Sequence, residues 1–200
     1  MRKLMIIALV AATAYGTYAE KTAGFQLSLT PDIATQDRDT RIKGVSLGVW
    51  NENPHGGWSI GFVSGFTGDS LGFSWIPYLN ILNYAENYKG VHWGWVNNTS
   101  GSFTGWQSGI VNLADDFTGF QSGLVNISHT SATGLQWGMV SYAGKMHGVQ
   151  LGLVNWTKAV DEWAFQLGLV NVIEDNPWFN NFPGELATGF VIANWSFGGN

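Results

Sequence analysis

Gly148-Val149-Gln150-Leu151-Gly152-Leu153-Val154-Asn155 is one copy of an eight-residue repeat of the form Gly-x-Gln-x-Gly-(Leu/Ile/Met/Trp)-Val-Asn. Successive copies begin 14 to 16 residues apart, and none of their 48 positions holds Lys, Arg, Asp or Glu. Such regular self-similarity indicates that every copy builds the same structural unit. The six copies are residues 90–97, 105–112, 119–126, 134–141, 148–155 and 164–171.

The side chains within a copy alternate with a period of two, which indicates a strand rather than a helix. In the copy at 119–126, Phe120, Ser122 and Leu124 share one face, and Gln121 lies between glycines on the other. Because two glycines on one face remove bulk there, we expect the sheet to curl toward the Gly-Gln face. The apolar face then points outward.

The composition is unusual for a soluble domain, since only 12% of the 200 residues are charged, against about 25% on average. Residues 1–19 have the features of an export signal, with Arg2 and Lys3 first, an apolar run at 4–10 and a small-residue site ending at Ala19. Residues 20–200 then form a single domain. The absence of cysteine excludes disulfides and thiolate metal sites. The acidic net charge of −5 argues against nucleic acid as a partner.

The connections between copies are six to eight residues long and hold all the charges between residues 90 and 171. A unit of 14 to 15 residues suits one strand of about 9 to 11 residues plus a short turn. Weaker copies extend the pattern in both directions. We therefore expect an all-β, antiparallel, up-and-down transmembrane β-barrel of 10 to 12 strands, clearest over 90–171. The weaker copies are residues 24–29, 44–51, 57–63, 68–75 and 187–197.

Two other folds would also cover the apolar face. In a soluble barrel or sandwich the apolar side chains would turn inward around a ligand, and in a parallel solenoid they would stack as a core with glutamine ladders outside. Both folds normally carry charges on their outer strand faces, so the neutral repeat favours the membrane barrel. Tryptophans near the expected strand ends suit an aromatic girdle at lipid headgroups; they are Trp50, Trp75, Trp93, Trp95, Trp156, Trp163 and Trp195.

The repeats at 148–155 and 164–171 resemble those of bacterial surface-repeat proteins, which are built from Gly-Leu-Gln-Leu-Gly-Leu-Val-Asn units. The resemblance covers residues 90–171 well and implies an exported protein of the outer membrane or cell surface, without a known activity. The segment from Gly189 to Phe197 alternates toward an aromatic end. It is similar to the last strand that outer-membrane proteins present to the barrel-assembly machinery, which is thus an implied partner together with outer-membrane lipid.

No catalytic, metal or cofactor site stands out in the sequence. The acidic pairs at 115–116, 161–162 and 174–175 lie in polar connections, and adjacent side chains of an extended chain point apart. There is no Gly-x-Ser-x-Gly element, and we expect a non-enzymatic protein without cofactors. The candidate functional residues line the expected polar lumen; they are His92, Gln107, Gln121, Gln136, Gln150 and Gln166.

The function expected from these patterns is that of an outer-membrane surface protein with a structural, interaction or narrow-pore role. The alternative is a soluble, secreted β-repeat module that binds carbohydrate or a host or cell surface. In either case we expect specificity to reside in the long irregular connections, at 30–43, 76–89 and 172–186.

Overall fold

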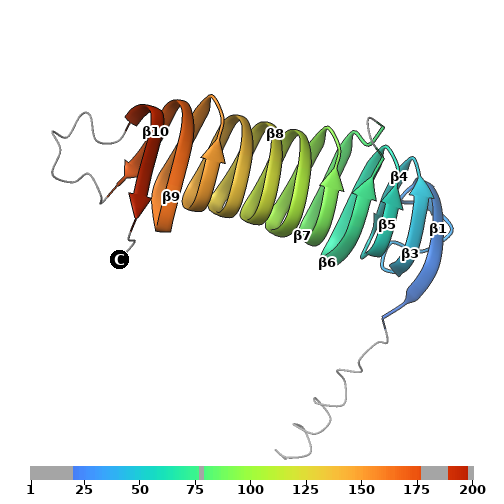
Figure 1. The fold of residues 1–200 in the computed structure, drawn as a ribbon. Helices are drawn as coiled ribbons and strands as arrows, with labels where there is room; N and C mark the ends of the chain where they lie inside the picture. The colour runs from blue at the N-terminus through green and yellow to red at the C-terminus, as the bar shows by residue number, and fades with distance from the viewer. Residues whose placement is uncertain (1–19, 77–78, 177–188, 198–200) are drawn as a thin grey trace, which may run out of the picture.

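The computed structural model describes residues 20–76, 79–176 and 189–197, which form one elongated β-structure (Figure 1). The expected export signal at 1–19 lies outside the described residues. The strands belong to one 10-stranded sheet, most of which winds around a common axis. The strands are β1 (Thr22–Thr30), β2 (Ile33–Ala34), β3 (Arg41–Gly48), β4 (Trp50–Asn53), β5 (Gly56–Ile60), β6 (Val63–Trp75), β7 (Leu82–Trp93), β8 (Val96–Leu151), β9 (Val154–Asp175) and β10 (Gly189–Phe197).

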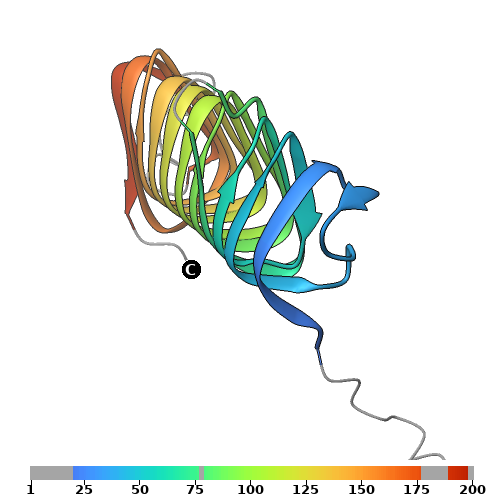
Figure 2. The ribbon, with the colours of Figure 1, turned by 90° about the vertical axis from the view of Figure 1, so that its right-hand side faces the viewer.

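The chain forms a β-solenoid, in which each turn pairs in parallel with the next. Gly90 pairs with Gly105 across β7 and β8, and Val140 pairs with Val154 across β8 and β9. These offsets equal the spacing of the sequence repeat, so identical positions lie above one another. The 56 residues of β8 are a single continuous strand that bends at each corner and stacks on itself (Figures 1 and 2).

One corner of each turn requires glycine. Gly119 has φ of +130°, and a Cβ placed on it would lie 2.1 Å from the carbonyl oxygen of Gly105 in the preceding turn. Both the dihedral and the space therefore exclude any side chain. Ala164 occupies the same position in the last copy, where the turn is 16 residues long and Glu162 has φ of +62°. The extra residue changes the local path at that corner.

The interior is filled by side chains from every turn. On one side aromatic rings form a row along the axis, in which Phe66 and Tyr88 are tilted with centroids 4.7 Å apart, and Phe103 and Phe117 are stacked with centroids 5.9 Å apart. Smaller or flexible side chains, including Ala132 and Met146, continue this core toward the C-terminus. Within β8 the core residues come from the stretches between the eight-residue repeats, and these stretches are strand rather than turns.

The two ends of the solenoid depart from the parallel pattern. At the N-terminal end, β2 pairs antiparallel with β1. At the C-terminal end, β10 pairs antiparallel with β9, with Asn194 opposite Gln166. The stretch 30–43 is largely irregular, as expected, since residues 31–40 hold only the two residues of β2, whereas the stretch 76–89 contains most of β7 and is not a long irregular connection. Residues 177–186, the larger part of the stretch 172–186, lie outside the described residues.

The antiparallel transmembrane barrel predicted from the sequence is therefore wrong, and so are its transmembrane strands and porin-like conduit. Adjacent copies run parallel, whereas an up-and-down barrel needs them antiparallel. The physical reason lies in the stacking of like residues. Gln107 and Gln121 can join their side-chain amides, 2.8 Å apart, because parallel, in-register pairing places them at the same height of successive turns.

Candidate functional site

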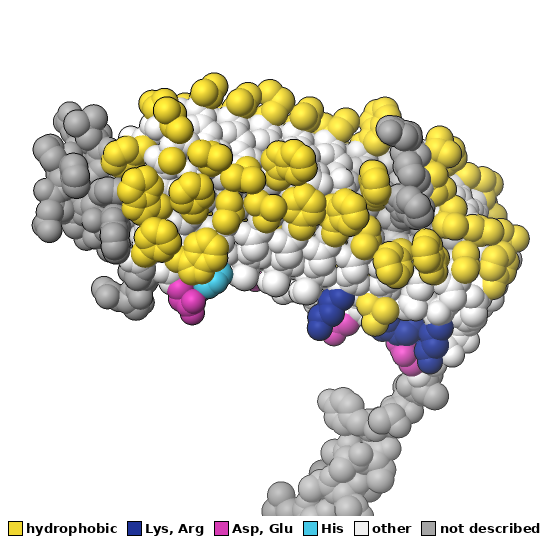
Figure 3. Space-filling model, in the orientation of Figure 1, with side chains coloured by type: hydrophobic (Ala, Val, Ile, Leu, Met, Phe, Trp, Pro, Cys, Tyr) yellow, Lys and Arg dark blue, Asp and Glu magenta, His cyan; other side chains and the backbone are white. Residues whose placement is uncertain are grey.

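The outward side of the Gly-Gln repeats forms a continuous apolar surface, here called the apolar wall. It consists of two neighbouring rows of side chains, one on each side of a corner, and Figure 3 shows hydrophobic side chains gathered in rows over the upper and middle parts of this face. Trp137 and Leu169 expose 59% and 62% of their surfaces. The apolar wall comprises Trp93, Trp95, Trp106, Ile110, Phe120, Leu124, Trp137, Met139, Leu151, Leu153, Leu167 and Leu169.

Charged side chains lie away from the apolar wall, along the border at the bottom of Figure 3. Lys145 and Asp161 form an ion pair of 3.4 Å, and Nδ1 of His147 lies 3.6 Å from a carboxylate oxygen of Glu162. Each of these residues belongs to the part of a turn that separates two Gly-Gln repeats. The outside of the solenoid is therefore divided into an apolar flank and a polar flank.

Three polar side chains within the apolar wall are joined by hydrogen bonds. The hydroxyl of Ser122 donates to the hydroxyl of Ser108 at 3.0 Å, and Nε1 of Trp106 donates to the Ser122 hydroxyl at 3.3 Å. At the edge of the same flank, Nε1 of Trp156 donates to Glu174 at 2.6 Å. The donors of Trp106, Ser122 and Trp156 would lose little on transfer out of water, because they already have acceptors.

A groove runs along the corner between the two rows of the apolar wall, parallel to the solenoid axis. Its floor consists of glycines, and we call it the glycine-floored groove. Two stretches of it, of 410 and 660 Å³, share Ser108 and Gly109 and are therefore continuous. Sequence reasoning assigned these glycines to sheet curvature only. The available signal was an apolar residue on each side of the second glycine, as in Trp137-Gly138-Met139. The floor is formed by Gly94, Gly109, Gly123, Gly138 and Gly152.

The six residues predicted to line a lumen all lie in the solenoid interior, fully buried. Five of them stack as one ladder, in which the amides of the last four each donate to the glutamine of the preceding turn at 2.7 to 2.8 Å; the residues are Gln107, Gln121, Gln136, Gln150 and Gln166. The amide of Gln107, the first of them, donates to the Thr99 hydroxyl at 3.3 Å. Their amides fill the interior and bind one another. This arrangement stabilises the stack of turns and leaves no polar conduit along this ladder.

A second interior ladder consists of the asparagines that end each repeat, which sequence reasoning did not single out. Nδ2 of Asn97 donates to Oδ1 of Asn112 at 2.7 Å, and Asn112 donates onward to Asn126 at 2.8 Å. Donation in this ladder runs toward the C-terminus, opposite to that of the glutamines. Ser141 occupies the same position in the fourth copy and interrupts the ladder.

His92 occupies the glutamine position of its turn, opposite Gln107, but it does not join the ladder. Its ring packs among Phe66, Tyr88 and Phe103, with centroid distances of 3.9 to 5.2 Å. Neither ring nitrogen meets a hydrogen-bond partner within the described part of the chain. Burial lowers the pKa of His92 to about 3, so the ring is neutral at physiological pH and is a core residue rather than an acid–base group.

The remaining titratable candidates do not assemble into a reactive centre. Asp116 accepts a hydrogen bond of 2.7 Å from Ser131 and lies on the polar flank. His55 is buried and contacts the hydroxyl of Ser46 at 3.0 Å, and desolvation lowers its pKa to about 4. Among the residues that the structure describes, no three His, Asp or Glu side chains are grouped to hold a metal ion.

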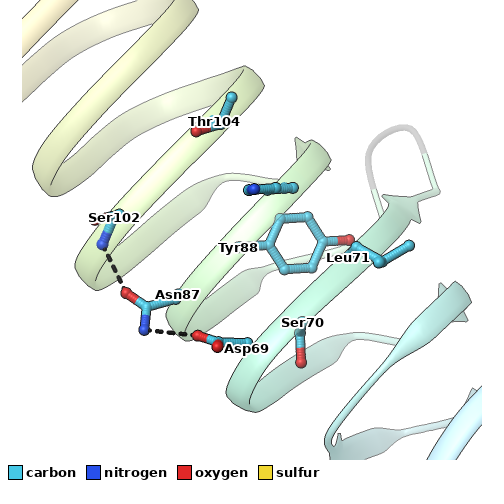
Figure 4. Close-up of a pocket in the computed structure, with 8 residues that line it drawn as sticks. Asp69, Ser70, Leu71, Asn87, Tyr88, Ser102 and Thr104 are labelled. Carbon is cyan, nitrogen blue, oxygen red and sulfur yellow. Dashed lines mark hydrogen bonds between the residues drawn. The ribbon is translucent and has the colours of Figure 1, made fainter.

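A shallow polar groove of 460 Å³ crosses β6, β7 and β8 in the N-terminal half of the solenoid (Figure 4). Asn87 links its neighbours, because its Nδ2 donates to Asp69 at 3.0 Å and its Oδ1 accepts from the main chain of Ser102 at 3.0 Å. Leu71 and Lys89 line the other side. The polar groups of this groove are largely joined in a chain along the solenoid axis, so it is a weaker candidate for binding than the apolar wall.

Comparisons with known proteins give no match from which a function could be taken. The chain matches no protein-family model, no curated protein sequence and no solved structure. Over the described ranges, no helix reaches the length and hydrophobicity that crossing a bilayer requires. The apolar wall and its groove are thus the features from which a function has to be inferred.

Proposed function

We propose that this protein is an exported binding module that lies side-on against a lipid surface, with its apolar wall toward the acyl chains and its polar flank toward water. The observation that carries the proposal is the large apolar wall beside a separate charged border (Figure 3). Exposed apolar patches larger than a few hundred square ångströms mark interaction sites in soluble proteins. The export signal expected at 1–19 agrees with a role outside the cytoplasm.

The backbone of the solenoid suits contact with hydrocarbon. Along the apolar wall the main-chain groups pair with the turns above and below; for example, the N–H of Ile110 donates to the carbonyl of Trp95 at 2.8 Å. Hydrocarbon tolerates only backbone groups that are already paired. The solenoid would lie on the surface as an amphipathic cylinder, in the manner of an interfacial amphipathic helix.

Lipid explains the composition of the apolar wall better than a sugar does. Recognition of a saccharide uses polar groups beside the aromatic platform, because buried sugar hydroxyls need hydrogen-bond partners. The hydroxyls of Ser108 and Ser122 and the indole of Trp106 already bond to one another. Leu, Ile, Met and Trp side chains occupy the rest of the wall, and each loses about 1.5 to 3 kcal/mol when it is left in water.

Flotation with lipid vesicles tests the proposal. The purified protein, mixed with neutral phosphatidylcholine vesicles and centrifuged through a density gradient, should rise with the vesicles. The double variant Trp137→Glu, Leu169→Glu places two charges on exposed positions of the wall and should remain at the bottom. The matched control Thr118→Glu, Thr133→Glu places the same charges on the polar flank and should still float. The proposal is contradicted if the native protein stays at the bottom. It is also contradicted if the native protein is a dimer in which the apolar wall of each copy is covered by the other.

A further inference from the structure

The glycine-floored groove has a defined length and an invariable floor. From Gly94 to Gly152 it crosses four steps between turns, and each step is about 4.8 Å, so this part is roughly 19 Å long. A Cβ added to Gly123 would lie 2.3 Å from the carbonyl oxygen of Gly109, and one added to Gly138 would lie 2.2 Å from that of Gly123. The close stacking of turns therefore keeps the floor free of side chains.

The walls of the groove are apolar on both sides. Trp137 rises on one side of the floor, and Leu124, Met139 and Leu153 form the other side. The serines that replace Trp at two turns make the groove wider there, and their hydroxyls bond to each other. None of the described side chains that line the groove is charged.

Neither a peptide strand nor a saccharide finds partners in this groove. The main-chain N–H of Gly94 already donates to Ser108 at 3.1 Å, and that of Gly152 donates to Leu167 at 3.0 Å. A strand adding to a sheet needs free main-chain groups at an edge, whereas this floor is the paired side of the solenoid. An occupant that forms no hydrogen bonds is the one that fits.

We propose that the glycine-floored groove seats one extended acyl chain of a lipid, aligned with the solenoid axis. This inference rests on the proposed function, because it names what the apolar wall takes from the lipid surface. The chains of one leaflet span half of a hydrocarbon core of about 30 Å, which is roughly 15 Å, so the groove is long enough for one of them. Trp95 and Trp137 would pack against its methylenes from opposite walls.

Photo-crosslinking with a palmitate that carries a diazirine on its chain tests this inference. In the native protein, irradiation should place the label within residues 93–153, and an excess of unlabelled palmitate should reduce the labelling at least tenfold. The double variant Ser108→Trp, Ser122→Trp, called the filled variant, closes the two wide steps of the groove with a side chain that the same position already carries at Trp93 and Trp137. It should lower labelling by a similar factor. The control Thr104→Trp, Thr118→Trp adds the same bulk on the polar flank and should label like the native protein.

Flotation of the same proteins separates this inference from the proposed function. The filled variant keeps an apolar wall, so it should still float with vesicles although its groove is no longer labelled. A native protein that floats but gives no competable label in the groove overturns the acyl-chain inference alone. Labelling without flotation supports the groove and contradicts the docking proposal. Labelling that survives in the filled variant, or a dimer in which a second copy shields the groove from the label, also overturns the inference.

Discussion

Nε2 of Gln121 donates a hydrogen bond to Oε1 of Gln107, 2.8 Å away and 14 residues earlier in the chain. The same bond recurs at Gln136, Gln150 and Gln166, one turn apart each time. Each buried amide thus depends on the turns on both sides of it. The ladder joins the turns into one cooperative unit, as expected for a protein in which each repeat contacts only its neighbours.

Replacing Gln121 by Met should destabilise the fold strongly. The side chain keeps its length, but Oε1 of Gln107 loses its donor and the Ser128 hydroxyl loses its acceptor, whereas Nε2 of Gln136 keeps other acceptors. An unsatisfied buried polar group costs about 1 to 3 kcal/mol, so we expect a loss of about 2 to 5 kcal/mol in the free energy of unfolding, measured with urea. The outward substitution Thr133→Met serves as the control and should change this value by less than about 0.5 kcal/mol. Equal losses for both variants would contradict a structural ladder.

Replacing His92 by Gln should stabilise the protein, and more so in acid. The folded-state pKa of His92 is about 3 because of burial, whereas an unfolded histidine titrates near 6.5. Below pH 6.5 the unfolded state therefore binds a proton that the folded state does not bind, and the free energy of unfolding falls as the pH drops toward 3. Removing this group should raise the free energy of unfolding at pH 4 by about 3 kcal/mol relative to the change at pH 8.

Urea titrations of native protein and variant at pH 4 and pH 8 give this difference directly. His55 remains in both proteins, and its lowered pKa of about 4 leaves a smaller acid sensitivity in the variant. A glutamine at position 92 would also place an amide opposite Gln107 and extend the ladder by one turn. The same stability gain at both pH values would show that the amide contact matters but that the titration does not.

Replacing Gly119 by Ala should prevent a stable fold. The residue has φ of +130°, and the added Cβ would lie 2.1 Å from backbone of the neighbouring turn. Both the positive φ and the close contact would strain an alanine at this position. We expect the free energy of unfolding to fall by at least about 3 kcal/mol, measured as a drop in the thermal or urea midpoint. Gly24→Ala is the matched control, because nothing lies within 4 Å of a Cβ there. An equal effect at both positions would argue against this corner geometry.

Docking to neutral vesicles should be insensitive to salt. The apolar wall contains no charged side chain, so its contact with lipid involves burial of apolar surface rather than ion pairing. Raising the ionic strength to about 1 M reduces the Debye length to about 3 Å and screens surface charges, yet the floating fraction should stay within about twofold. Release of the protein by salt would show instead that the charged border makes the contact.

The sequence predicts the strands of this protein but not their pairing. Alternation of Phe120, Gln121, Ser122 and Leu124 specifies which side chains share a side, and it does so in a barrel and in a solenoid alike. The pairing direction depends on the path of the chain between copies. That path is set at corners such as Gly119, whose positive φ leaves no mark on the pattern beyond the glycine itself.

The stretches between copies held the missing signal. Phe103, Phe117 and Met146 lie two residues before the first glycine of the next copy, and all three are buried in the core. In a barrel those stretches would be turns, where a regularly placed apolar residue has no purpose. The acidic and basic residues beside them masked this regularity, because a charged stretch is usually a solvated turn. The neutral outward face, which favours lipid in either fold, could not decide between the two.

The opposite directions of the two amide ladders have an electrical consequence. In an α-helix the peptide dipoles point the same way and add up to partial charges of about half an electron at the ends. Here the glutamine amides donate toward the N-terminus and the asparagine amides toward the C-terminus, so the side-chain dipoles oppose one another in the turns where both ladders are present. A solenoid built in this way can gain or lose such turns without building up a large side-chain dipole along its axis. It can therefore lie in a medium of low polarity without placing large partial charges at its ends.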